Sequence, residues 1–454
     1  MEKITAKVAE FISSSTYENI PREVTELGKL HILDTLGVLI AGSQGDIATI
    51  VSGYIQSLAG KQESTVLTQG LKTSAPYAAF GNGVIAHALD FDDYESPSMA
   101  HPSVTVLPAV LAMGEKLKLP GRVCLEAYLV GLEIISKVGR AINPDHYDKG
   151  WHSTGTLGTL GAAAASAKLL KLDGERIRMA LGIAGSMSSG LRANFGTMTK
   201  PLHAGHAARN GVEAALLASQ GFTATTTVFE SDLGFCDLFT QEKNYDLRKI
   251  IADLGAPFSI QSPGIGKKPY PSCAATHSFL DGIFQLIERY DIQAEDVESL
   301  ECGIFYRLPN MLIHATPQTG LEGKFSLEFC IALALLERKV GIGQFTDAKV
   351  KEPKIQALIG RITKKVTAEA GGKDTLYPAA IMTVHMKNGV NYPCKVEKRK
   401  GSPASPLSAA EIMQKFMDCA QLCYSADQSR RILEAVLIME KTDDIGQVIQ
   451  SFTC

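Results

Sequence analysis

The stretch from Ser74 to Ala218 carries a helical pattern almost without interruption, and small residues crowd it. Glycines and alanines stand at close intervals in its second half: Gly155, Gly158, Gly161, Ala162, Ala163, Ala164, Ala165, Gly182, Gly185 and Gly190. Small side chains let helices approach closely, so the stretch predicts a packed all-helical core. Membrane helices share this feature, but polar residues interrupt the stretch too often, and no run of about 18 apolar residues occurs.

The composition is that of a globular protein that can hold two domains. The chain has 454 residues, of which 45% are hydrophobic and 20% are charged. Its formal net charge of −3 gives no reason to expect nucleic acid or an anionic membrane as a partner. The first residues alternate charged and apolar side chains, unlike a signal peptide, and the nine cysteines are scattered. We therefore expect a cytoplasmic protein with reduced thiols and no iron–sulfur cluster.

The pattern changes after Gly255. Residues 261–271 hold three prolines and two glycines, which is typical of a linker. Residues 299–307 and 380–387 alternate as strands do, and Asn388-Gly389 after the second segment predicts a hairpin. Two helices are expected between these segments, at 327–338 and 347–362.

The last segment, 404–453, returns to a helical pattern, with Ser408 and Glu411 spaced as a capping box. We expect these helices to pack back on the first domain. The predicted fold is mainly α, with a large all-helical domain built from both chain ends (1–262 and 401–454) and a smaller α+β lid domain (263–400).

The most polar stretch, 87–103, is the first candidate for a functional site. Histidines and acidic residues define it: His87, Asp90, Asp92, Asp93, Glu95 and His101. Buried helices are predicted before it, at 75–88, and after it, at 104–117. Carboxylates so close to apolar helices are costly to desolvate unless they are paired, so the cluster indicates chemistry.

Three further polar islands stand at 151–154, 197–206 and 267–277. Each combines histidine or lysine with a loop that leads into a helix, and the candidate residues are His152, Lys200, His203, Lys268, Ser272 and His277. A helix amino end favours anions. Two or more such ends, together with Lys200 and Lys268, would form a receptor for a polycarboxylate.

Each candidate also has a structural interpretation. A buried histidine usually makes one hydrogen bond and has no further role, and Lys200 and the Lys267-Lys268 pair can be solvated loop residues. Asp92 and Asp93 can be helix caps. Three histidines have no polar cluster around them in sequence and are assigned to structure: His31, His314 and His385.

Other chemical classes fit the motifs less well. His203 and His206 have metal-ligand spacing on a helix, but no carboxylate lies nearby in sequence, so no metal is predicted. Ser272-Cys273 lacks the surroundings of a catalytic nucleophile. The all-helical isoprenoid synthases bind magnesium diphosphate on DDxxD motifs. Residues 92–96 lack the last aspartate of that motif, and no second acidic motif follows.

Five stretches together resemble one family, and they occur in that family's order over essentially the whole chain. They are residues 32–37, 82–103, 155–158, 199–203 and 270–277. The chain resembles the MmgE/PrpD family, which includes 2-methylcitrate dehydratase, cis-aconitate decarboxylase and iminodisuccinate epimerase. The resemblance implies a large helical domain, a smaller lid domain and a homodimer.

The resemblance also implies a set of active-site positions: Asp90, Tyr94, His101, His152, Lys200 and His277. Tyr94 is a departure, because the animal decarboxylases carry a threonine there. Those enzymes also have a tyrosine after an Arg-Leu/Ile-Pro-Asn turn, where this chain has Met311-Leu312-Ile313. Both departures favour proton transfer without loss of carbon dioxide.

The chemistry that the family implies is proton movement at a carbon next to a carboxylate, without metal or organic cofactor. We expect His101 and His152 to exchange protons with this carbon, Asp90 to orient one of them, and Lys200 to stabilise the charge. Substrate carboxylates are expected to bind at Tyr94, Lys268, Ser272, His277 and His203.

The expected ligand is a di- or tricarboxylate, and the expected substrate is an aconitate-like tricarboxylic acid. The expected outcome is isomerisation, either between cis and trans forms or by epimerisation. Two alternatives remain open: a lyase of the same family, and a non-catalytic carboxylate-binding or scaffold protein.

Overall fold

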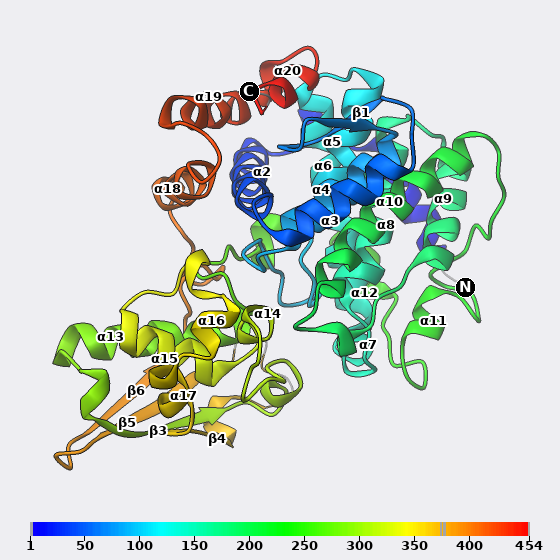
Figure 1. Ribbon diagram of the computed structural model, residues 1–454. Helices are drawn as coiled ribbons and strands as arrows, with labels where there is room; N and C mark the ends of the chain where they lie inside the picture. Colours follow the sequence, from blue (N-terminus) through cyan, green and yellow to red (C-terminus); the bar gives the residue numbers. More distant parts are fainter. Residues whose placement is uncertain (1–2, 373–374, 376–377, 453–454) are drawn as a thin grey trace.

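Two main hydrophobic cores divide the computed structural model into two lobes (Figure 1). The structure describes residues 3–372, 375 and 378–452, so the ends of the predicted helical domain and residues 373–374 and 376–377 of the predicted lid lie outside the described residues. The larger core draws on residues 4–265 and 412–452, and we call this part the helical lobe. The smaller core draws on residues 279–396, and we call this part the sheet lobe.

The helical lobe confirms the predicted mainly α fold. Its helices before the sheet lobe are α1 (Ile4–Ser14), α2 (Arg22–Gly42), α3 (Asp46–Ser57), α4 (Ala75–His87), α5 (Ser103–Leu117), α6 (Gly121–Ile142), α7 (Asp145–Asp148), α8 (Ser153–Leu169), α9 (Gly174–Met187), α10 (Thr199–Ser219), α11 (Phe235–Phe239) and α12 (Arg248–Ile251). A short antiparallel hairpin, β1 (Ser64–Val66) and β2 (Leu71–Thr73), was not predicted. Helix α2 begins at Arg22, directly after Pro21, and proline is common at the start of a helix.

Glycines bring α4 and α10 into close contact, and Figure 1 shows the two helices in the centre of the lobe. A Cβ atom on Gly83 of α4 would lie 2.8 Å from the Cα atom of Gly205 in α10. A Cβ atom on Gly205 would lie 2.3 Å from the backbone oxygen of Phe80. Because α4 ends at His87 and α10 begins next to Lys200, this crossing positions two residues of the polar islands.

The sheet lobe holds a mixed four-stranded sheet in the order β4-β3-β5-β6. Its strands are β3 (Val297–Ile304), β4 (Ile362–Val366), β5 (Ala380–Met386) and β6 (Asn391–Val396). Strand β3 runs parallel to β4 and antiparallel to β5, and the predicted hairpin joins β5 to β6 through Gly389 at a φ of 83°. The helices of this lobe are α13 (His277–Tyr290), α14 (Gly320–Gly323), α15 (Leu327–Glu337), α16 (Asp347–Val350) and α17 (Pro353–Ile359), and the longer ones lie on one side of the sheet (Figure 1).

The prediction of a single helix at 347–362 is wrong. Helix α16 ends at Val350, and α17 begins at Pro353, because proline cannot donate a helical hydrogen bond and favours a first turn. Ile362 already belongs to β4, which pairs with Leu300 of β3. Pairing between distant segments therefore overrides the local helical pattern at the end of this stretch.

The carboxyl-terminal helices pack on the helical lobe. They are α18 (Ala409–Ala420), α19 (Ala426–Leu437) and α20 (Gly446–Gln450). The predicted capping box is confirmed, because the Ser408 hydroxyl accepts from Glu411 N at 3.2 Å and the Glu411 carboxylate accepts from Ser408 N at 2.9 Å. Phe416 of α18 is buried against Gly37 of α2, so both chain ends build one core.

Within the described residues, no individual helix combines the length and the apolar character of a membrane span. In the described part of the chain one pair of helices, α2 and α3, meets those criteria when taken together, and the pair is bent by 88° at the break between them.

The crossing of α4 and α10 leads to a stability prediction. We expect Gly205→Ala to lower the free energy of unfolding by about 1–3 kcal/mol, because a methyl group there overlaps the backbone of α4. Gly53→Ala on α3 is the matched control, since a Cβ atom at Gly53 meets nothing within 4 Å and alanine favours a helix. Denaturant unfolding of both variants measures the effect, and equal stability of the two would contradict the close-packing account.

Candidate active site

A cavity of about 920 Å³ lies between the two lobes. The helical lobe contributes polar and charged side chains to its wall: Asp90, Tyr94, Glu95, His101, Arg140, His152 and Lys200. The sheet lobe and the segments that join it to the helical lobe contribute Cys273, Phe305, Arg307, Leu308, Met311, Phe325 and Arg399. This volume is typical of small-molecule sites, and a polycarboxylate fits within it.

Asp90 is a buried carboxylate that two lysines neutralise. It lies in the loop after α4 with a φ of 51°, in the left-handed region. Its Oδ1 atom is 2.7 Å from Lys200 Nζ and 3.0 Å from Lys268 Nζ, and Lys268 also donates to the backbone oxygen of Asp90 at 2.8 Å. Burial alone would raise the pKa of Asp90, but the two ammonium groups hold it well below its usual range. Asp90 is therefore ionised.

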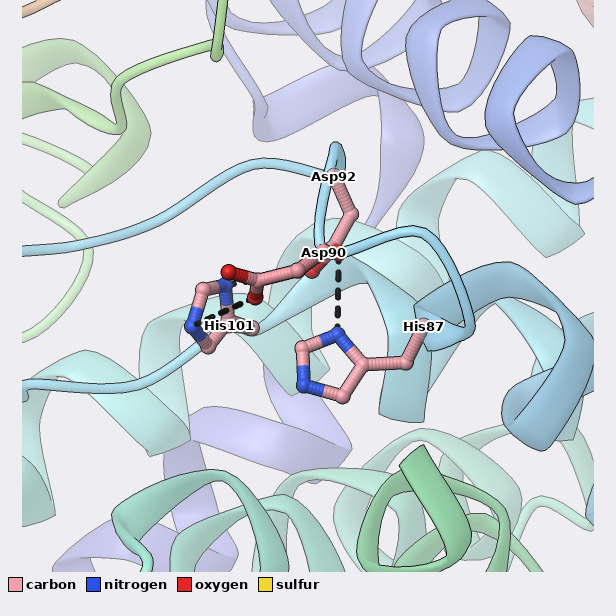
Figure 2. Close-up of side chains that lie close together, drawn as sticks. All are labelled: His87, Asp90, Asp92 and His101. Carbon is pink, nitrogen blue, oxygen red and sulfur yellow. Dashed lines mark hydrogen bonds and ion pairs between the residues drawn. The ribbon is translucent and has the colours of Figure 1, made fainter. Parts of the chain in front are cut away.

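Asp92 links His87, at the end of α4, to His101, just before α5 (Figure 2). Its Oδ1 atom is 2.9 Å from His87 Nδ1, and its Oδ2 atom is 3.1 Å from His101 Nδ1. His101 Nδ1 also lies 2.8 Å from the backbone oxygen of Asp93, to which it can donate. With the hydrogen on Nδ1, His101 keeps Nε2 free to accept a proton, and this atom is 4.0 Å from Asp90 Oδ1.

Lys200 sits between His87 and Asp90. Its Nζ atom is 2.7 Å from His87 Nε2 and 2.7 Å from Asp90 Oδ1. Burial lowers the pKa of His87 to about 3, although Asp92 opposes this shift. Neutral His87 therefore donates from Nδ1 to Asp92 and accepts from Lys200 on Nε2. An ammonium group has three N–H donors, so one donor of Lys200 remains for a ligand in the cavity.

His152 and His203 form a second pair. His152 precedes α8, and its Nδ1 atom is 2.9 Å from His203 Nδ1, so one ring donates to the other. Burial, together with Lys200, holds the pKa of His152 well below its usual value, so the ring is neutral. Among the described residues, His152 Nε2 has no hydrogen-bond partner, although it is buried and the residue lines the cavity.

Of the predicted site residues, five line the cavity: Asp90, Tyr94, His101, His152 and Lys200. The other four lie behind its wall: Lys268, Ser272, His277 and His203. Lys268 binds Asp90, and His203 binds His152, so both contact residues that line the cavity. Ser272 and His277 contact each other, because His277 Nε2 lies 3.2 Å from the Ser272 backbone oxygen, to which it can donate. Their direct contact with a substrate remains a prediction.

His31 does not stand apart from polar residues, so the reason given for assigning it to structure is wrong. Its Nδ1 atom is 3.0 Å from Asp93 Oδ2, and its Nε2 atom is 2.7 Å from Lys267 Nζ. Lys267 is correspondingly buried rather than solvated. Asp93 also accepts from Ser103 N at the start of α5, which fits its interpretation as a helix cap. The packing of α2 against the loop creates this network, and sequence distance hides it.

Arg399 and an apolar wall were not predicted. Arg399 stands in a charged run, 397–400, which is typical of a solvated segment, but it lines the cavity and donates to the Tyr94 hydroxyl at 2.8 Å. The apolar wall comes from Tyr147, Phe195 and Phe325, which form a small buried cluster of their own. These residues are far apart in sequence, so no local signal marks them.

Four ligand atoms of His87, Asp90, Asp92 and His101 lie within 4.8 Å of one another, close enough to suggest a metal site. However, Lys200 Nζ lies 2.7 Å from both His87 and Asp90, and Lys268 Nζ lies 3.0 Å from Asp90. These ammonium groups already supply positive charge and would repel a divalent cation. The residues therefore do not fit a metal ion.

Glu95, on the cavity wall, leads to a prediction about pH. Burial raises the pKa of Glu95 to about 7, although the Ser136 hydroxyl donates to it at 2.5 Å. An unfolded glutamate titrates near pH 4.3, so between roughly pH 4.5 and 7 the folded chain keeps a proton that the unfolded chain has lost. The free energy of unfolding should therefore fall by up to about 3 kcal/mol across this window because of Glu95.

Glu95→Gln should remove this contribution, because an amide does not ionise. Denaturant unfolding of both proteins at pH 5 and pH 8 measures it, and the variant should gain stability relative to the parent at pH 8. The same difference between the two proteins at both pH values would contradict the assignment of a buried, protonated Glu95.

Comparisons with known proteins agree on one family. A family model described as the MmgE/PrpD N-terminal domain matches residues 6–248, and one described as the MmgE/PrpD C-terminal domain matches residues 270–441. The chain is 28% identical to cis-aconitate decarboxylase of Homo sapiens, over 98% of this chain and 93% of that protein. It is 26% identical to cis-aconitate decarboxylase of Aspergillus terreus, over 99% of this chain and 96% of that protein. The chain belongs to the MmgE/PrpD family.

Proposed function

We propose that this protein is an acid–base enzyme that moves a proton at the carbon next to a carboxylate of an aconitate-like tricarboxylic acid. The observation that carries the proposal is that His101, His152 and Lys200 all line one cavity. Two imidazoles beside an ammonium group can remove and return protons next to an anion. The relatives named cis-aconitate decarboxylase support the same class of substrate.

Lys200 is our candidate for holding the carboxylate beside the reacting carbon. Two of its three N–H donors bind His87 and Asp90, and the third remains for the substrate. Loss of a proton from the neighbouring carbon moves negative charge onto the carboxylate oxygens. The ammonium group stabilises this charge, and the nearby ring of Phe325, 5.4 Å away, keeps the surroundings poor in water.

His101 is our candidate for the base. Its Nδ1 hydrogen is directed to the Asp93 backbone oxygen, so Nε2 is the nitrogen that can accept a proton. The ring then becomes a cation, and Asp92 at 3.1 Å stabilises that cation. Asp90, 4.0 Å from Nε2, adds to the same effect.

His152 is our candidate for the acid that returns the proton. Burial and Lys200 hold its pKa well below the usual value, so the ring is neutral at rest and readily passes on any proton that reaches it during turnover. When His203 donates to His152 Nδ1, the hydrogen of His152 stands on Nε2. It can be given to the substrate as the shared hydrogen moves from His203 to His152 Nδ1, and His203 takes up a proton from solvent in its place. When His152 donates instead, Nε2 accepts. The pair can therefore work in either direction.

Isomerisation is the outcome that we favour. In this outcome His101 takes a proton from carbon, the double bond shifts or rotates within the stabilised anion, and a proton returns to carbon. No carbon–carbon bond breaks. Met311 lines the cavity with a thioether that cannot donate a proton, and the Tyr94 hydroxyl is already bound to Arg399. Both features differ from what the family resemblance leads us to expect of an animal decarboxylase.

Decarboxylation is the second candidate. The named relatives favour it, and so does the apolar wall of Tyr147, Phe195 and Phe325, because a carboxylate against this wall loses hydration. In this outcome the bond between carbon and the carboxylate breaks, and its electrons stay on carbon. Carbon dioxide leaves, and His152 supplies the proton that the carbon takes up.

A non-catalytic carboxylate-binding or scaffold protein remains the alternative of another class. It predicts binding without proton exchange, which a single experiment can separate from catalysis. A homodimer and a cytoplasmic location also remain predictions.

Proton exchange tests the proposed function. We expect incubation with cis-aconitate in deuterated water to place deuterium on substrate carbon, as followed by NMR, with trans-aconitate, 2-methylcitrate and citrate in the same panel. New resonances distinguish the isomer from the decarboxylated product. His101→Gln should lower the rate by about 10²–10⁴-fold, because it removes the base.

The control variant is His385→Gln. His385 lies on β5 in the sheet lobe, does not line the cavity, and binds Asn391 of the neighbouring strand β6. It should keep the parent rate, and a chelator should leave the rate of the parent unchanged. Binding without exchange on every compound would favour the non-catalytic alternative. Full exchange by a folded His101→Gln protein would overturn the assignment of the base.

A further inference from the structure

Arg399 joins three segments at the cavity wall. It follows β6 on the connection back to the helical lobe and is half-buried. Its Nε donates to the Tyr94 hydroxyl at 2.8 Å, and its two terminal nitrogens donate to the Ala274 backbone oxygen and the Ser96 hydroxyl, each at 3.3 Å. The guanidinium also lies over the Tyr94 ring, 4.4 Å from its centre. These contacts fix the group in one orientation.

No carboxylate of the described chain forms an ion pair with Arg399, although the charge of Arg399 partly opposes the rise that burial causes in the pKa of Asp281. Its hydrogen-bond partners are a phenol, a hydroxyl and a carbonyl, and no ion pair joins it to a carboxylate among the described residues. The other arginines of the cavity are paired, because Arg140 lies 3.1 Å from Asp253 and Arg307 lies 3.0 Å from Asp148.

The two cavity lysines differ from Arg399 as well. Lys200 lies 2.7 Å from Asp90, and Lys249 is exposed to solvent. Arg399 is thus the one partly buried cation of the cavity wall that forms no ion pair with a carboxylate among the described residues.

Arg399 also keeps donors for a ligand. A guanidinium has five N–H groups, and the three contacts above use three of them. The remaining donors belong to the terminal nitrogens, which match the two oxygens of a carboxylate. A partly buried cation without an ion-pair partner is unfavourable, so an anionic group that binds it recovers that free energy.

We infer that Arg399, held in place by Tyr94 and Ser96, binds a carboxylate of the substrate other than the one at Lys200. This inference rests on the proposed function and explains why the substrate would be a tricarboxylate. Lys200 takes the carboxylate beside the reacting carbon, and Arg399 takes a distant one. Tyr94 is then a positioning residue, because it accepts from the guanidinium and supports its face. The enzyme should therefore bind tricarboxylates better than dicarboxylates of similar shape.

Calorimetric binding of two unreactive probes tests the inference without need of turnover. Tricarballylate is a saturated tricarboxylate, and methylsuccinate is the same skeleton without one terminal carboxylate. The parent should prefer tricarballylate, and Arg399→Met should lower this preference by about 10- to 100-fold, the worth of a charged hydrogen-bonded pair. Arg399→Lys keeps the charge but not the planar guanidinium group, so its preference for tricarballylate should lie between those of the parent and Arg399→Met.

Arg307→Met is the matched control, because it removes the same group from the same cavity, but one that Asp148 already neutralises. It should keep the parent's preference for tricarballylate. A purely structural role for Arg399 would lower the thermal midpoint and weaken both probes equally, which would overturn the inference. So would an unchanged preference in Arg399→Met.

The failure of the inference and that of the proposed function are distinguishable. A parent protein that binds both probes equally, yet exchanges protons on aconitate, would overturn the role of Arg399 alone. A parent protein that binds neither probe and exchanges no proton on any compound of the panel would overturn the proposed function, and the inference with it.

Discussion

The site depends on one buried ionic interaction, that of the Asp90 carboxylate with the ammonium groups of Lys200 and Lys268. A carboxylate that is 3% exposed is tolerated only when it is paired, and here two cations lie within 3.0 Å of one oxygen. The three residues come from the loop after α4, from the start of α10 and from the segment that links the two cores. Their pairing therefore fixes the positions of three distant parts of the chain.

The histidines of the site are connected to this interaction. Burial keeps His87 neutral, so it accepts from Lys200 and donates to Asp92, and Asp92 in turn lies 3.1 Å from His101. The positive charge of Lys200 also helps to hold the pKa of His152 well below its usual value. Of the two rings that line the cavity, His101 therefore stands beside a carboxylate and His152 beside a cation. Acid–base chemistry at a carboxylic acid substrate needs such a difference.

Much of this arrangement could be predicted from sequence. The end of a buried helix at His87, the loop of acidic residues and the helix after Pro102 follow from local patterns, and the structure has α4 and α5 there. The four polar islands also come together, because each of them contributes residues to the cavity wall, and Lys268 of the fourth binds Asp90. Local chemistry cannot show which side chain faces the cavity. Lys268 and His203 stand one residue behind it, although their islands are correctly identified.

The misses share a physical cause, which is contact between residues far apart in sequence. Tyr94 and Arg399 are separated by 305 positions, and His31 and Lys267 by 236. A pattern over ten or twenty residues cannot report such pairs. The broken helix at Pro353 and the strand at Ile362 are a milder case, since proline marks the break but only the pairing with β3 makes the strand.

The most direct test of the ionic interaction is a double-mutant cycle of Asp90→Asn and Lys268→Met, followed by denaturant unfolding. Removing Asp90 leaves Lys268 buried without its carboxylate, and this change should cost about 3–5 kcal/mol. Removing Lys268 leaves Asp90 with Lys200 alone and should cost less, and the double variant should cost clearly less than the sum of the two single changes. Strictly additive losses would show that Asp90 and Lys268 do not stabilise each other, and that result would contradict the account.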